Sequence, residues 1–96
     1  MLYKFSFERM IKRNVVARGN IIIARQCLEN NPKDVQKARA LIEEAMDIMK
    51  LQELEIDEMM KMSYPNNEED LENAREIVCS YTSNCLQLEK LKIMLK

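Results

Sequence analysis

"VQKARALIEEAMDIMKLQELEIDEMM", residues 35–60, carries the pattern that decides the fold. Its apolar residues recur at alternating steps of three and four, which is the spacing of one face of an α-helix. The face consists of Val35, Ala38, Ile42, Ala45, Met49, Gln52, Ile56 and Met59. Helix-forming Ala, Leu, Glu, Lys and Met also dominate the composition. The stretch therefore predicts a long helix over residues 33–62.

Residues 6–30 show a matching stripe and predict a helix ahead of this one. The stripe consists of Phe7, Met10, Asn14, Ala17, Ile21, Ala24 and Leu28. Folding the chain back at the turn-like segment "ENNPKD", residues 29–34, places Ile21 beside Ile42. The same fold brings alanines opposite alanines, which permits close approach of the two backbones. Asn14 and Gln52 would then be buried amides that fix the register.

A third helix is predicted over residues 67–95, after the turn-like segment "SYPNNEED", residues 63–70, in which Asn66 or Asn67 would cap it. Its apolar stripe consists of Leu71, Ala74, Val78, Tyr81, Cys85, Leu88 and Leu95. Folding back at this turn places Ile42 near Leu88, so both hairpins close in a single register. The sequence therefore predicts an all-α protein with a single helical domain over residues 1–96. We expect an antiparallel three-helix bundle that self-associates.

The composition argues against most catalytic and metal-binding chemistry. The 96 residues include no histidine, one glycine and three cysteines, so the commonest general base and metal ligand are missing. Most carboxylates are expected on a solvated face, and we predict no metal site, no cofactor and no enzymatic activity. The longest apolar run, residues 21–24, is too short to span a bilayer, and the N-terminus lacks the pattern of a secretory signal. Cysteines in no known spacing favour a cytoplasmic protein.

The first predicted helix has more apolar surface than two neighbouring helices can cover. On a helical wheel, Ile22 joins the packed stripe, whereas Val16, Ile23 and Cys27 lie together on the opposite side. The only glycine, Gly19, falls on the polar side of the wheel. Helices that are apolar on several sides are usually buried, so we predict that this helix contacts a second copy of the chain or another protein.

Two arginines, Arg18 and Arg25, fall inside the packed arc of the first helix. Their stems would lie along apolar surface while their charged ends pair with acidic groups on the other two helices. Alternatively, the guanidinium groups would present their donors to a carboxylate of a partner. The predicted partner-binding site consists of Val16, Ile23, Arg18 and Arg25.

Charge is divided unevenly along the chain. Residues 1–28 carry six positive charges and one negative charge, whereas residues 29–96 carry nine positive and fifteen negative charges. The basic residues Arg9, Lys12 and Arg13 would contact a nucleic-acid backbone in an alternative interpretation. In the predicted bundle these residues lie close to the acidic segments 53–58 and 68–72, which favours charge pairing within the chain.

From these features we expect a small helical protein that binds another protein through its first helix, as a regulator, inhibitor or adaptor, and that also forms a homodimer. The alternative is a nucleic-acid-binding transcriptional regulator that uses Arg9, Lys12 and Arg13. An enzyme or a metal-binding bundle is the third hypothesis. The abundance of Ile, Lys, Asn, Glu and Met is typical of an AT-rich bacterial or phage coding sequence.

Overall fold

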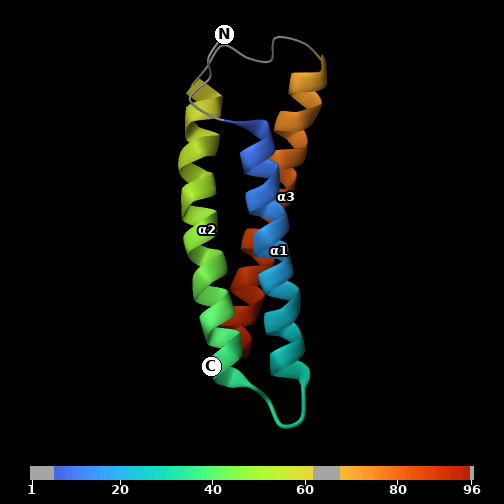
Figure 1. Ribbon diagram of the computed structural model, residues 1–96, viewed down its shortest axis with the longest axis vertical. Coiled ribbons are helices and arrows are strands. Elements are labelled where there is room, and N and C mark those ends of the chain that lie inside the picture. The colour runs from blue at the N-terminus through green and yellow to red at the C-terminus, as the bar shows by residue number, and fades with distance from the viewer. Residues whose placement is uncertain (1–5, 62–67, 96) are drawn as a thin grey trace.

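The computed structural model describes residues 6–61 and 68–95, which form three helices (Figure 1). These are α1 (Phe7–Glu29), α2 (Val35–Lys61) and α3 (Glu68–Met94). α2 runs antiparallel to α1, and α3 returns in the direction of α1. The predicted all-α three-helix bundle is confirmed, whereas the predicted caps Asn66 and Asn67 lie outside the described residues. None of the three helices is long and apolar enough to cross a membrane.

Polar side chains explain where α1 and α2 begin. The hydroxyl of Ser6 accepts a hydrogen bond from the backbone N–H of Arg9 at 3.3 Å. The carboxylate of Asp34 accepts one from the backbone N–H of Lys37 at 3.1 Å. Both bonds satisfy a donor that the first turn of a helix leaves unpaired. In α3, three acidic residues in the first turn lie at the positive end of the helix dipole.

Small residues allow α1 and α2 to pack closely. Four alanines of these helices have no exposed surface: Ala17, Ala24, Ala38 and Ala45. They belong to one core cluster with Ile21 and Ile42, in agreement with the predicted register of the first hairpin. The side-chain amide of Asn20 also reaches across to the carbonyl oxygen of Leu41, at 3.5 Å. Because the alanine side chain is a single methyl group, the backbones of α1 and α2 can pack closely at these positions.

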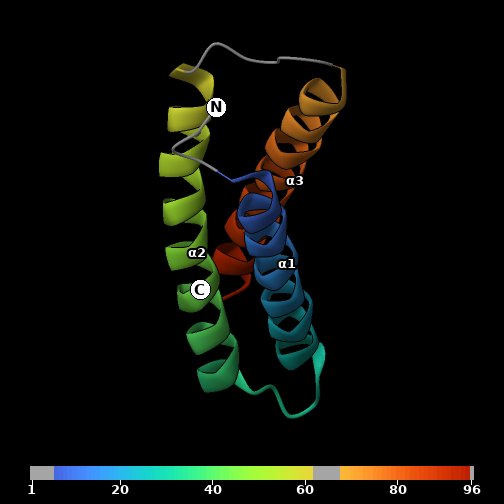
Figure 2. The same ribbon diagram turned by 45° about the horizontal axis from the view of Figure 1, so that its top comes forward.

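α3 packs mainly on α1, and its contact with α2 is the smallest of the three contacts between helices. In both views α3 slants behind α1, so that its C-terminal end lies nearer to α2 than its N-terminal end does (Figures 1 and 2). Its buried residues are Ala74, Ile77, Asn84, Leu88 and Leu91. The predicted stripe on α3 is therefore correct in part: Ala74 and Leu88 are buried, and Leu88 shares a core cluster with Ile42 as predicted. Val78 is 37% exposed, and Leu71, Tyr81 and Cys85 are only half-buried.

A buried asparagine accounts for this error. The Asn84 side-chain amide donates to the carbonyl oxygen of Asn14 at 3.0 Å, so α3 turns this polar residue toward α1. Ile77 lies seven residues earlier, on the same face, and enters the core with it. The sequence prediction placed Asn14 in the core but left Asn84 out, and it selected the neighbouring Val78 and Cys85 instead.

Buried amides connect α1 to both of its neighbours. Asn14 donates to the carbonyl oxygen of Ile77 at 3.1 Å, and Gln52 donates to that of Met10 at 2.7 Å. Together with the bond from Asn84, these contacts favour one height and one rotation of α1 in the bundle. The side-chain oxygens of Asn14 and Gln52 accept no hydrogen bond from the described residues, so this control of register costs stability.

The stripes of α1 and α2 also depart from prediction at their ends. Val35 is 39% exposed, and Phe7 and Ile56 are half-buried. Glu55, which was expected on a solvated face, is buried instead, with 7% of its surface exposed. The reason is electrostatic: Arg9 and Arg13, near the start of α1, pair with its carboxylate and hold it between the two helices.

Replacing Ala45 with leucine is expected to lower the free energy of unfolding by about 1–3 kcal/mol, because the added carbons would push α1 and α2 apart. Ala40 lies on the exposed side of the same helix and offers a matched control. Ala40→Leu should change the free energy of unfolding by less than about 0.5 kcal/mol. Urea denaturation followed by circular dichroism measures both variants. Equal effects would contradict the close α1–α2 contact.

Candidate functional site

Four aliphatic side chains of α1 project away from the bundle. Val15 is 65% exposed, Val16 51%, Ile22 48% and Ile23 42%. We call these residues, together with Gly19 among them, the outer face of α1. The predicted site residues Val16 and Ile23 are thus left uncovered by α2 and α3. Two predictions for this helix are wrong: Cys27 is buried, and Ile22, which was expected inside the packed arc, is exposed.

Hydrogen bonds to the neighbouring helices show why this face points outward. On one flank of α1, Arg13 and Asn20 contact α2. On the other flank, Asn14 and Arg25 contact α3. The buried stripe of α1 lies between these two flanks. The remaining arc is the outer face. It extends further toward α3 than predicted, because it includes Val15 and Ile22.

The two arginines of the predicted site have different surroundings. Arg25 is half-buried and donates to the side-chain oxygen of Gln87 on α3, so its partner is a neutral amide and not the acidic group that was expected. Arg18 is exposed and borders two shallow hollows between α1 and α3. None of the ion pairs among residues 6–61 and 68–95 involves Arg18. Its guanidinium group therefore remains accessible beside the outer face.

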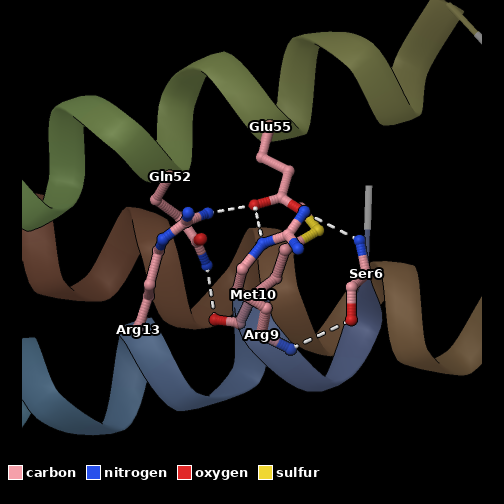
Figure 3. Close-up of polar contacts among 6 residues, drawn as sticks. All are labelled: Ser6, Arg9, Met10, Arg13, Gln52 and Glu55. Atoms are coloured by element: carbon pink, nitrogen blue, oxygen red, sulfur yellow. Dashed lines mark hydrogen bonds and ion pairs between the residues drawn. The ribbon is translucent and has the colours of Figure 1, made fainter. Parts of the chain in front are cut away.

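A cluster around Glu55 fastens the start of α1 to α2 (Figure 3). Its carboxylate accepts a hydrogen bond from the backbone N–H of Ser6 at 2.8 Å and one from Nε of Arg9 at 3.0 Å. Terminal guanidinium nitrogens of Arg9 and Arg13 pair with the same carboxylate. In a capping box, a glutamate three residues after Ser6 would bind the N–H of Ser6. Arg9 occupies that position, and α2 supplies the glutamate.

The arginines determine the ionisation of Glu55. Burial alone would raise the pKa of its carboxyl group, but the hydrogen bonds from Arg9, the Ser6 N–H and Arg13 outweigh it and hold the pKa below its usual value. The hydrogen bond to Glu55, and then its charge, raise the pKa of Arg9. The cluster therefore stays ionised at neutral pH and lies at the positive end of the α1 dipole.

This cluster engages two of the three residues considered for nucleic-acid binding. Arg9 and Arg13 both contact Glu55, whereas Lys12 is exposed. The expected pairing with the acidic segment 53–58 is confirmed through this single glutamate. A signal for Glu55 was present in the sequence, because it lies three residues after Gln52 and four before Met59. That spacing is the same as the spacing of the buried stripe.

Three hollows on the described surface are small. Those at Arg18 and the one between α2 and α3 have volumes of about 120 to 140 Å³, whereas pockets for drug-sized ligands measure about 300–1,000 Å³. Burial beside the α2–α3 hollow raises the pKa of Tyr81 to about 12, helped by a hydrogen bond with Cys85 and by nearby carboxylates. Among the described residues, no group of three or more Asp, Glu or Cys side chains could hold a metal ion.

Comparisons with known proteins find no counterpart. No family model matches the chain, and no match is found among curated proteins or solved structures. The outer face of α1 is therefore assigned from burial, charge and helix geometry.

Glu55→Gln is expected to lower the free energy of unfolding at pH 7 by about 1–3 kcal/mol, because it weakens hydrogen bonds to charged groups. The pKa of Glu55 is lowered on folding, so its contribution exists above the unfolded pKa and is lost as the pH falls through the folded pKa. The wild type should therefore lose more stability than Glu55→Gln between about pH 5 and pH 2. Urea denaturation over this range measures the difference.

Glu44→Gln is the matched control for that experiment, because Glu44 is an exposed glutamate of the same helix. Its pH dependence should follow that of the wild type. Parallel curves for the wild type and Glu55→Gln would show that the cluster contributes nothing to stability.

Proposed function

We propose that this protein acts by binding another protein chain through the outer face of α1. The proposal rests on four aliphatic side chains, each 42–65% exposed, within the nine residues from Val15 to Ile23. Single exposed aliphatics are common on proteins, but a contiguous apolar patch marks a surface that another molecule covers. The opposite side of the same helix is packed against α2 and α3.

Polar groups border the patch, as they do at protein interfaces. Arg18 borders the patch on its α3 side. The exposed side chains of Lys12 and Gln26 border it toward the two ends of α1. A buried apolar centre with a polar rim is the usual composition of a protein–protein contact. The accessible guanidinium of Arg18 suits a carboxylate of the bound chain.

We propose a binding role, as a regulator, inhibitor or adaptor in the cytoplasm, without a catalytic step. The absence of histidine from the sequence and the small volume of the described hollows support binding over catalysis. Nucleic-acid binding has less support, because Arg9 and Arg13 donate to Glu55. A phosphate backbone would have to compete with that carboxylate for the same donors.

Site-specific photo-cross-linking tests the proposal. A photoreactive amino acid at position 23 of the full chain, expressed in cells, should give a cross-linked protein product on illumination. The same amino acid at position 54 is the control, because Leu54 is 64% exposed on α2. The product from position 23 should disappear when Val16→Glu is added, since a charge on the patch opposes burial. It should persist when Leu51→Glu is added on α2.

Two outcomes would contradict the proposal. One is the absence of any cross-linked protein from position 23, the second copy of the chain included. The other is a product that forms equally from positions 23 and 54, which would indicate random collisions.

A further inference from the structure

The only glycine of the chain lies at the centre of the outer face of α1. Gly19 is helical, and a Cβ atom added to it would meet nothing within 4 Å. A glycine in the interior of a helix destabilises it relative to alanine, so the fold of a single chain gives no reason for glycine here. Glycine does permit another backbone to approach closely.

The aliphatic side chains are arranged symmetrically about Gly19. Val15 and Val16 lie four and three residues before it, and Ile22 and Ile23 lie three and four residues after it. A helix turns about 100° per residue, which places Val16 and Ile23 in one row on the α2 side. Val15 and Ile22 form the other row on the α3 side. The backbone at Gly19 lies between the two rows, on a strip along which a second helix fits.

We propose that the α1 helix of a second copy of this chain occupies the strip, antiparallel to the first, with a two-fold axis passing beside Gly19 of both copies. The inference rests on the proposed function, since it names the occupant of the same surface. A two-fold contact uses the same patch on both copies, so the patch must match itself after a half-turn. The equal spacing of aliphatics before and after Gly19 meets that requirement: the valines of each copy meet the isoleucines of the other.

Charges on the strip select the antiparallel orientation. In that orientation the exposed Lys12 faces the uncharged Gln26 of the second copy, seven residues from the glycine on either side. The two Lys12 side chains then lie about 21 Å apart along the helix axis. In a parallel pair Lys12 would face Lys12, and Glu8, one turn earlier, would face Glu8. Like charges would then oppose one another at both positions.

A contact made by one helix from each copy is narrow. Interfaces that bury less than about 1,200 Å² are typical of weak, exchanging complexes. We therefore expect a monomer–dimer equilibrium with a dissociation constant of about 10–100 µM. Gly19 contributes by bringing the two helices close enough for the four aliphatics of each copy to be covered.

Sedimentation equilibrium of the purified full chain, from about 1 µM to about 1 mM, tests this inference. The wild type should change from monomer to dimer across the range. Gly19→Gln should raise the dissociation constant at least about tenfold, because two glutamine side chains would collide at the axis. Leu54→Gln, which removes an exposed aliphatic from α2, is the control and should leave the dissociation constant unchanged.

Thermal unfolding of the dilute protein separates this effect from misfolding. Below the dissociation constant, Gly19→Ala should raise the midpoint by about 3–6 °C, because alanine favours the helix and its Cβ meets open space. Gly19→Gln should shift the midpoint in the same direction. A substitution that stabilises the monomer and weakens the dimer cannot act through loss of folding.

Three results would overturn the inference: a wild-type chain that stays monomeric over the whole range, a Gly19→Gln variant that dimerises like the wild type, or a Lys12→Gln variant that dimerises several-fold more tightly. The last would indicate a parallel pair relieved of repulsion, whereas the antiparallel pair predicts a change of less than about twofold. If the purified chain is monomeric but still cross-links from position 23 to a different protein in cells, the inference of a second copy is wrong. The proposed function would then still be supported.

Discussion

Asn14 holds α1 against α3 through two hydrogen bonds, and the amide of Gln52 holds α1 against α2 through the carbonyl oxygen of Met10. These bonds are directional, so they favour one rotation of α1 about its own axis as well as one height in the bundle. The surfaces of the protein follow from that rotation. It turns the alanines of α1 toward α2, brings Arg9 and Arg13 to Glu55, and leaves the aliphatic outer face about half exposed. Turning α1 by one residue would bury a different set of side chains.

Much of this arrangement was predictable from the sequence. The three helices and the register of the first hairpin follow from apolar and alanine spacing that continues unbroken through residues 7–28 and 38–59. The buried stripe of α3 followed only in part, because it includes Asn84, and a polar residue enters a core only when a partner for it exists. That partner, the carbonyl oxygen of Asn14, belongs to a helix 70 residues away in the chain. The spacing of three and four residues is compatible with Asn84 in the stripe, but spacing alone does not show that this side chain has a buried partner.

The candidate site was predicted in part, for a related reason. Val16 and Ile23 lie opposite the packed stripe and are identifiable on a helical wheel. Whether Ile22 is covered depends on where α3 sits around α1, which α1 alone does not determine. Glu55 was missed because a charged residue is assumed to face water. Its burial depends on Ser6 and two arginines 42 to 49 residues away, which surround one carboxylate.

The contacts of α1 are spread over its whole length, from Ser6 near its start, through Asn14, to Arg25 near its end. A helix fastened in this way has little backbone freedom left to lose when another molecule docks on it. The aliphatic side chains of its outer face are all valine or isoleucine, whose branched Cβ atoms already hold one preferred rotamer in a helix. The entropic penalty of ordering this surface is therefore small, and a modest contact area suffices for recognition. The chain therefore presents a preorganised docking surface, and in the proposed two-fold pair both partners dock with little adjustment.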